Sequence, residues 1–286
     1  MLDISAKNEY GFSINFKNNK NFEIIEATGL NPVSASINSS SIPNYSGSIF
    51  NSAYVGNRNI VLSVKYKAYN SEARKELNSV FIPSASVTLT IGKYYIDGYV
   101  ESTEYNIYNE NIIIQISIIC LYPYFSNGIE NTVKISNTVS LFQFPVAFPS
   151  SGIPFSEAQE DISAVITNYG DIQVGCVIKI YISQYLNGFI INNSEHGQSM
   201  YLNMTRAPLH SGDEVTIDTR FGKKSITLTS DTYSMYNESI LDYLDSVTNW
   251  IEIAPGENKI TLDPPTGDTL TAIEAYITYS ESVGGL

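Results

Sequence analysis

The stretch Asn111-Ile112-Ile113-Ile114-Gln115-Ile116-Ser117-Ile118-Ile119-Cys120 is apolar at nearly every position and is soon followed by Pro123. Isoleucine is β-branched and packs well on a pleated surface, and proline cannot donate a hydrogen bond to a sheet ladder. The pattern therefore predicts a strand that ends before the proline. Because apolar residues occupy both of its faces, we expect this strand to be central and covered on both sides.

Further elements are expected on the N-terminal side of this strand. Alternation of apolar and polar residues predicts strands over Tyr10–Phe16, Phe22–Ala27, Arg58–Tyr69, Ser86–Ile91 and Lys93–Ser102. One helix is expected over Ser71–Phe81, since Ala73, Leu77 and Val80 recur at helical spacing. Asn70 or Ser71 can cap its first turn.

Residues 31–58 differ from these strands. They are rich in Ser, Asn, Pro and Gly and carry few charges. We expect a long loop, or an arm with little structure of its own. A loop of this length in a compact domain is usually functional or ordered by a partner.

The second half of the chain begins after a junction at residues 126–157, where Phe144–Pro154 holds three prolines and a glycine. Short strands then alternate with turn signals, which is typical of a sandwich or barrel. The turn signals are Asn168–Asp171, Asn187–Gly188, Glu195–Gln198, Ser211–Asp213 and Phe221–Lys223, and a helical turn is expected at Ser239–Asp245. The chain is predicted to be mainly all-β, with one domain at 1–128 and another at 129–286.

Length and charge agree with two unlike domains. The chain has 286 residues, of which 16% are charged, and its net charge is −13. Residues 1–128 hold nine Lys and Arg against ten Asp and Glu (−1), and residues 129–286 hold seven against nineteen (−12). Identical near-neutral surfaces can pack with little repulsion. We therefore expect the first domain to form any homo-oligomer contact and the second to face outward.

Several partners and compartments are disfavoured. The chain is acidic and its four arginines are scattered, so we do not expect it to bind nucleic acid. Binding of the phosphate backbone requires clustered Lys and Arg. No stretch is apolar and long enough to insert in a membrane, and the N-terminal residues lack the apolar core of a secretion signal.

No catalytic, cofactor-binding or metal-binding residue is predicted. Nucleotide-binding glycine loops are absent, and Gly222–Ser225 is interpreted as a hairpin turn. His196 and His210 lie in turn-rich sequence without a nucleophile elbow, so each is interpreted as a surface loop residue. Cys120 and Cys176 are interpreted as two reduced, buried thiols, with one disulfide between the domains as the alternative.

Acidic and aromatic residues of the second half leave two alternatives open. Asp213 and Asp218 are expected on opposite faces of a strand, with Glu214 beside Asp218. Weak calcium binding by an acidic loop and a convergent carboxylate pair for sugar hydrolysis are not excluded by the sequence. Trp250 shares a face with Glu252, and we interpret it as a core or interdomain anchor in preference to a sugar platform.

Four turn-like stretches follow one another along nearly the whole chain. They are Gly29–Pro32 with the arm and Arg58–Leu62; Ile119–Phe125; Asn168–Asp171 with Asn187–Asn193 and Ser211–Thr219; and Trp250–Ile260. In this order and spacing they resemble the distal tail proteins (Dit) of bacteriophages that infect Gram-positive bacteria, and of related prophages and tailocins.

The resemblance implies a structural protein of the virion tail, assembled in the bacterial cytoplasm, and not an enzyme. It implies an N-terminal β-domain with one helix that forms a hexameric ring, from which a C-terminal galectin-like β-sandwich projects. The ring would join the tail tube protein to the tail hub protein in the tail tip or baseplate and carry receptor-binding proteins. Residues 31–57 would then contact the neighbouring copy.

Two other functions are kept as alternatives. One is a carbohydrate-binding adhesion module that contacts the host cell wall through the C-terminal sandwich. The galectin sugar signature, His-x-Asn-x-Arg, is however absent, because His210 is followed by Ser-Gly-Asp. The other is a hydrolase, which would need a carboxylate pair that only the fold can reveal.

Overall fold

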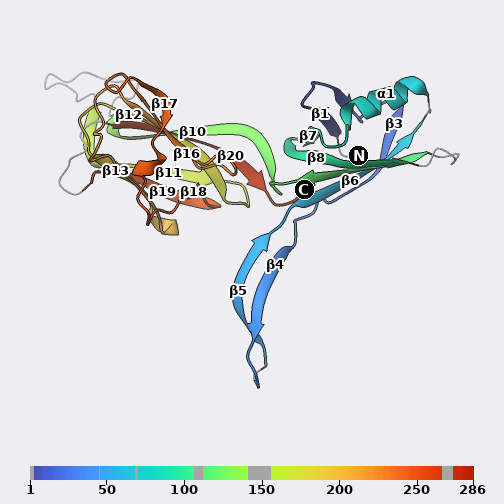
Figure 1. Cartoon of the computed structure of the whole chain (residues 1–286), viewed down its shortest axis with the longest axis horizontal. Coiled ribbons are helices and arrows are strands. Elements are labelled where there is room, and N and C mark those ends of the chain that lie inside the picture. The colour runs from blue at the N-terminus through green and yellow to red at the C-terminus, as the bar shows by residue number, and fades with distance from the viewer. Residues whose placement is uncertain (1–2, 45, 68–69, 106–111, 141–155, 266–272) are drawn as a thin grey trace, which may run out of the picture. The chain divides into compact units, whose positions relative to one another are not determined.

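A computed structural model describes residues 3–44, 46–67, 70–105, 112–140, 156–265 and 273–286. The chain folds into two compact units (Figure 1). Unit 1 comprises Met1–Gly128 with Ser282–Leu286, and unit 2 comprises Ile129–Glu281. The last five residues, which the sequence placed in the second domain, thus belong to unit 1.

Unit 1 is built on one antiparallel sheet in the order β2-β1-β7-β8-β9-β6-β3. Its strands are β1 (Ile4–Asn8), β2 (Ser13–Asn15), β3 (Phe22–Thr28), β6 (Arg58–Tyr66), β7 (Ser86–Ile91), β8 (Tyr94–Tyr105) and β9 (Ile113–Cys120). The inward side chains of these strands form one apolar core, which includes Phe22, Leu62, Leu89 and Ile116. The predicted β-domain with one helix is confirmed.

Strand β9 is central, as predicted, and pairs with β6 and β8. Only one of its faces is covered. Ile114, Ile116 and Ile118 are buried, whereas Ile113 is 44% exposed. The expectation of two covered faces is wrong for this chain, because the described part of unit 1 supplies a packing layer on one side of the sheet only.

Helix α1 (Ser71–Val80) supplies part of that layer. It begins at Asn70, whose Oδ1 accepts a hydrogen bond from the backbone N–H of Ala73 at 2.7 Å. Ala73, Leu77 and Val80 are buried on its inner face. The predicted helix and its cap are both confirmed.

The first strands differ from the prediction. Strand β1 was not predicted, although Ile4 and Ala6 alternate into the core. The predicted strand over Tyr10–Phe16 shortens to β2, because a turn occupies its first residues. Tyr10 and Phe12 are exposed in that turn, and only the residues after them reach the core.

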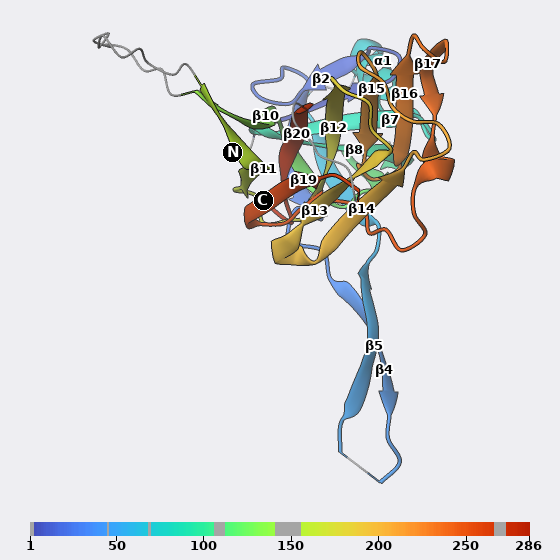
Figure 2. The same ribbon diagram turned by 90° about the vertical axis from the view of Figure 1, so that its left-hand side faces the viewer.

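The segment predicted as a long loop is a two-stranded hairpin of β4 (Ala35–Ser41) and β5 (Ser48–Val55). We call this hairpin the arm. The expectation of little structure is wrong, because the two strands pair from Ala35↔Val55 to Ser41↔Ser48 with one register shift. Asn44 and Gly47 adopt positive φ angles between them, which lets the chain reverse. In Figures 1 and 2 the arm extends away from the sheet of unit 1.

Unit 2 is a sandwich of two antiparallel sheets (Figure 2). One sheet has the order β10-β11-β19-β13-β14. The other has the order β20-β12-β15-β16-β17, with β18 also paired to β12 and β10 also paired to β20. Both sheets contribute to one core, so of the sandwich or barrel that the turn spacing predicted the structure has the sandwich.

Unit 2 combines three strands of 11 to 16 residues with shorter elements. They are β10 (Phe125–Ser140), β11 (Ser156–Asn168), β12 (Val174–Ile182), β13 (Gly188–Asn193), η1 (Ser194–His196), β14 (Gln198–Asn203), β15 (Glu214–Asp218), β16 (Ser225–Ser230), β17 (Met235–Ser239), η2 (Leu241–Tyr243), β18 (Glu252–Ile253), β19 (Gly256–Asp263) and β20 (Ile273–Val283). η2 confirms the predicted helical turn. Among the described residues, no helix is long and apolar enough to cross a membrane.

The described part of the predicted junction at 126–157 is not irregular. Its first part is the long strand β10, which runs from unit 1 into unit 2. The turn signal Ser126–Gly128 is accommodated within the strand, where Gly128 has a φ of 69°. The proline-rich stretch Phe144–Pro154 lies outside the described residues.

Candidate functional site

The arm has one mainly apolar face and one mainly polar face. Directly paired residues of an antiparallel ladder point to the same side, so the register assigns each side chain to a face. The apolar face holds Ala35, Ile37, Phe50, Ala53 and Val55, with Ser39, Ser41 and Ser48 towards the tip, and the polar face also carries Ile49 and Tyr54. On the polar face, Asn38 Nδ2 donates to Ser52 Oγ at 3.0 Å and Asn51 Nδ2 donates to Ser40 Oγ at 2.6 Å.

The apolar face of the arm is uncovered in this chain. Ile37 is 68% exposed, Phe50 65% and Val55 37%. Residues 31–57 contain no Asp, Glu, Lys or Arg, so the arm has no charge with which to interact with water or with an ionic partner. An isolated two-stranded hairpin is marginally stable in water. These properties are typical of a segment that docks on another protein surface.

The arm is attached to unit 1 through the buried side chain of Arg58, which is 2% exposed. Arg58 Nη1 donates to the carbonyl oxygens of Gly29 and Asn31, at 2.8 Å for Asn31. Arg58 Nε donates to Pro123 O at 2.6 Å, and Nη2 donates to Gly284 O at 2.5 Å. One side chain thus joins both ends of the arm to the entry of β10 and the exit of β20.

The charge of Arg58 is balanced by dipoles, since no ion pair in the described part of the chain involves it. Burial lowers the pKa of Arg58, and the four carbonyl oxygens offset part of the cost of removing the charge from water. The guanidinium also lies 4.5 Å from the centre of the Phe125 ring. Removing this side chain would leave several carbonyl groups without their donors.

A glycine allows the arm to leave the sheet next to Arg58. Gly29 has a φ of 80°, and a Cβ atom there would lie 2.0 Å from Asn59 O. Leu286 N donates to Leu30 O at 2.9 Å, so the C-terminal residues also pair with the root of the arm. The sequence singled out Gly29–Pro32 and Arg58–Leu62 as motifs but did not reveal that they meet. An arginine at the start of an otherwise apolar strand was the available signal.

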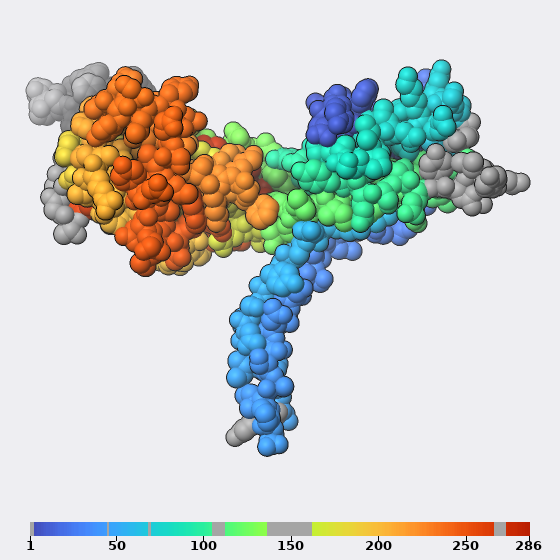
Figure 3. All heavy atoms as spheres, viewed as in Figure 1, coloured from blue at the N-terminus to red at the C-terminus, as the bar shows by residue number. Residues whose placement is uncertain are grey.

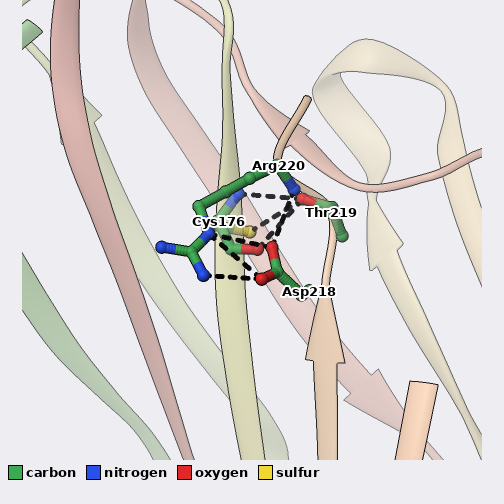
Figure 4. Close-up of polar contacts among 4 residues, drawn as sticks. All are labelled: Cys176, Asp218, Thr219 and Arg220. Carbon is green, nitrogen blue, oxygen red and sulfur yellow. Dashed lines mark hydrogen bonds and ion pairs between the residues drawn. The ribbon is translucent and has the colours of Figure 1, made fainter. Parts of the chain in front are cut away.

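Both cysteines are free and buried, which confirms the interpretation as buried thiols. Burial raises the pKa of Cys120 and of Cys176 to about 12, so both thiols stay protonated near neutral pH. Figure 4 shows Cys176 next to Thr219, whose hydroxyl donates to Cys176 O at 3.1 Å and accepts from Cys176 N at 2.8 Å. This contact anchors two strands and activates neither group.

The ion pair beside this contact is a surface feature. Arg220 Nη2 lies 2.6 Å from Asp218 Oδ2, and Arg220 Nε also donates to Asp218 (Figure 4). Burial opposes the charge of Asp218, but the hydrogen bonds from Arg220 hold the pKa of Asp218 below its usual value. Gly222 then turns the chain into β16, as predicted.

The histidines occupy unlike positions. His196 is exposed in η1. His210 is half-buried, with its ring 5.6 Å from that of Tyr185 and 5.5 Å from that of Tyr233. The expectation of a surface loop residue is therefore wrong for His210, because neighbouring aromatic rings enclose it. Neither histidine hydrogen-bonds a serine or cysteine nucleophile among the described residues.

The acidic residues of β15 lie as expected. Asp213 is buried and accepts a hydrogen bond from His210 N at 2.8 Å, whereas Glu214 and Asp218 point outward. Glu214 Oε1 lies 3.5 Å from Lys179 Nζ. Within the described ranges, no group of three or more His, Cys, Asp or Glu side chains is arranged to hold a metal ion.

Trp250 lies half-buried at the edge of the core of unit 2. Lys224 Nζ is 5.4 Å from its ring centre. The predicted alternation holds, because Ile251 and Ile253 are buried while Trp250 and Glu252 are partly exposed. Its position at the core edge, with a cation at the ring, agrees better with an anchoring role than with a sugar platform.

The Trp250–Ile260 signature is structural, as interpreted. Asn258 is fully buried; its Oδ1 accepts from Ala254 N at 3.0 Å, and its Nδ2 donates to Ala254 O at 2.8 Å. Asn193 Nδ2 donates to Asn258 Oδ1 at 3.1 Å. Gly256 has a φ of 88°, which glycine adopts without strain.

Comparison with known proteins gives two informative matches. Residues 169–282 match the family model of the siphovirus-type tail component, C-terminal domain (SPP1_Dit). The crystal structure of the SPP1 Dit (gp 19.1) protein is similar over 98% of this chain and 98% of its own, with a TM-score of 0.63 and 11% identity. Its title describes it as a paradigm of the hub adsorption apparatus in Gram-positive infecting phages.

A chain in the activated baseplate of phage P2 with calcium is more distant. It covers 97% of this chain and 98% of its own, with a TM-score of 0.44 and 9% identity. No curated protein matches the sequence. At 11% identity, the likeness to the SPP1 protein shows a shared fold.

Proposed function

Because residues 169–282 match the family model of the siphovirus-type tail component, C-terminal domain, and the chain shares the fold of the SPP1 Dit protein, we propose that it is a distal tail (Dit) protein, a structural adaptor in the tail tip or baseplate of a bacteriophage or a related particle. It would assemble as a hexameric ring that joins the tail tube protein to the tail hub protein and carries receptor-binding proteins. No catalytic role is assigned to it.

The observation that carries this proposal is the uncharged, amphipathic arm. Burying a large apolar side chain fully contributes about 1.5–3 kcal/mol. With Ile37, Phe50 and Val55 exposed to 68%, 65% and 37%, docking of the apolar face would contribute roughly 3–5 kcal/mol for each arm. In a closed ring every copy both gives and receives an arm, so this contribution is repeated at each interface.

Charge supports the assignment of unit 1 as the ring domain and of unit 2 as the outward domain. The first 128 residues are almost neutral (−1), whereas the remaining residues carry −12. If unit 2 of every copy, each with a net charge of −12, lay next to the ring axis, the copies would repel one another. The acidic sandwich, which we regard as galectin-like, therefore suits the periphery, where receptor-binding proteins would attach.

The test is the oligomeric state of the purified chain, measured by mass photometry and by electron microscopy. The wild-type chain should form six-fold rings as its concentration rises. Ile37→Asp with Phe50→Asp places two charges on the apolar face of the arm and should leave a monomer. Ser36→Asp with Ser52→Asp places the same charges on the polar face and should leave the rings intact.

Three results would contradict the proposal. A wild-type chain that stays monomeric and is also absent from purified particles has no adaptor role. Rings of another symmetry would contradict the hexamer alone. Equal loss of assembly in both double variants would show that the apolar face is not what docks.

A further inference from the structure

The turn between β1 and β2 displays two aromatic side chains to solvent. Tyr10 is 65% exposed and Phe12 is 51% exposed. Gly11 lies between them with a φ of 86° and has no neighbouring atom within 4 Å of a Cβ built on it. The dark-blue N-terminal residues, which include this turn, lie beside the cyan helix α1 in Figure 3. Two aromatic residues in one short turn are exposed although each could bury a large area in a core.

The buried side chain of Asn8, which is 4% exposed, fixes this turn. Its Oδ1 accepts hydrogen bonds from Tyr10 N at 3.1 Å and Phe12 N at 3.0 Å. Its Nδ2 donates to Ser79 O at 2.8 Å and Val80 O at 3.2 Å, at the end of α1. Both donors and both acceptor positions of the amide are thus used. The same side chain caps the helix and sets the conformation of the turn.

The flank of the turn is also tied down. Glu9 N donates to Ser86 O at 3.2 Å, and Ser86 N donates to the Glu9 carboxylate at 3.3 Å. A turn held in this way loses little conformational freedom when a partner binds. Rigid aromatic side chains with few torsions are the usual anchors of protein interfaces. The geometry is that of a preorganised protein-binding element.

We propose that the Tyr10–Phe12 turn is a docking anchor for a protein other than this chain, which receives the two rings in an apolar pocket. Figures 1 and 2 show that the turn and α1 lie on the side of unit 1 opposite the arm. The inference rests on the proposed adaptor function, which assigns the arm to contacts between copies. The opposite side is then available to a different component of the particle.

A second copy is a poor receptor for this anchor. The apolar face of the arm is itself a row of projecting side chains on a two-stranded ribbon, and two projecting surfaces do not interlock. A hollow on the described surface of α1 is lined by polar and charged residues, namely Ser71, Glu72, Arg74, Lys75, Asn78 and Ser79. None of these lining residues is a large apolar side chain against which an aromatic ring could pack.

A membrane is also a poor receptor. Residues 8–12 contain one acidic residue, Glu9, and no basic residue. Segments that bind lipid surfaces combine aromatic residues with Lys and Arg, which interact with anionic headgroups. An acid at this position favours a protein pocket with a neutral or basic rim.

The proposal is tested in particles that contain the full chain. A photo-crosslinking phenylalanine derivative replaces Tyr10 in one variant and Tyr236 in a control, since Tyr236 is 84% exposed in unit 2. After irradiation of purified particles, mass spectrometry identifies the adducts. A different polypeptide joined at position 10, and not joined at position 236, is the expected result. An adduct with another copy of the chain, or no adduct at position 10, overturns the proposal.

A double variant, Tyr10→Ser with Phe12→Ser, gives the quantitative test. Because both side chains are exposed, its thermal midpoint and its six-fold rings should match wild type, while its recovery in particles should fall at least tenfold. Normal recovery overturns the anchor but leaves the ring intact. Loss of the rings assigns the turn to self-association and also overturns it. Vesicles of anionic lipid should not bind the wild-type chain; binding that depends on Phe12 would identify a membrane anchor instead.

The same experiments separate this inference from the adaptor function. A wild-type chain that is present in particles as rings, yet gives no foreign adduct at Tyr10, refutes the anchor alone. A wild-type chain that is absent from particles refutes the adaptor function, and the anchor with it.

Discussion

Replacing Arg58 by methionine should destabilise unit 1 selectively. The guanidinium donates to four carbonyl oxygens, and hydrogen bonds to a charged group contribute about 1.5–3 kcal/mol each. Together the four hydrogen bonds contribute roughly 6–12 kcal/mol. The methionine variant no longer has to remove a charge from water, which regains several kcal/mol and offsets part of that loss. Methionine keeps the apolar contact with Phe125 and cannot donate. We therefore expect a net loss of about 3–5 kcal/mol.

Two probes make this prediction selective. Hydrogen exchange measured by mass spectrometry on peptides from β6 and β9 should accelerate by roughly 100- to 5,000-fold, since each 1.4 kcal/mol changes the open population tenfold. The single tryptophan, Trp250, lies in unit 2, so the urea midpoint of its fluorescence should move little.

The matched control is Arg74→Met on the exposed face of α1, which should stay within about 0.5 kcal/mol of wild type. The reasoning is refuted if Arg58→Met changes the protection of β6 and β9 no more than this control does. It is also refuted if both units lose protection equally, because the carbonyl groups that Arg58 binds all belong to unit 1.

Three further outcomes follow from the contacts described above. Gly29→Ala should destabilise unit 1 by more than about 3 kcal/mol, since its Cβ would lie 2.0 Å from Asn59 O. Its control, Gly11→Ala, has open space around the new Cβ and should lower the stability by only about 1 kcal/mol. Equal urea midpoints for the two variants would contradict this expectation. Trp250→Ala should lower the stability of unit 2 by about 1–3 kcal/mol and leave binding to cell-wall polysaccharide unchanged, and a selective loss of polysaccharide binding would support the sugar-binding alternative. Both thiols have a pKa of about 12 in the folded chain against 9.0 in the reference state, so the stability they contribute is fully present below pH 9 and is lost between pH 9 and 12. Titration with a thiol reagent at pH 8 should then detect no thiol until denaturant is added, and rapid labelling without denaturant would show that the burial is wrong.

The spacing of apolar residues predicted those elements in which the apolar positions of the sequence match the buried positions of the structure. Helix α1 has an asparagine cap and apolar residues at helical spacing, and both features act within the helix itself. Strand β9 pairs on both edges in the centre of the sheet, and its run of β-branched residues predicted that position. Its second face was misjudged, since no layer from the described ranges covers Ile113 and Ile119.

Long-range contacts were not predictable in the same way. Arg58 meets Gly284, which is 226 residues away in the sequence, and no periodicity encodes that encounter. The arm was read as a loop because serine and asparagine are common in loops. Its pairing depends on the register between two strands and on a turn, which together outweigh the weak propensity of those residues. Tyr10 and Phe12 are spaced as in a strand but lie in a turn. The turn forms because the side-chain oxygen of Asn8 accepts hydrogen bonds from the backbone N–H groups of both residues.

The route of the chain between the two units has a mechanical consequence. Unit 2 is inserted into unit 1, so the polypeptide enters it along β10 and leaves it along β20. A pulling force applied to unit 2 is therefore divided between two strands. Arg58 holds Pro123, just before the first strand, and Gly284, just after the second, so the two load paths converge on one residue. A single extended linker would transmit the same tension through one backbone and would allow free rotation about it.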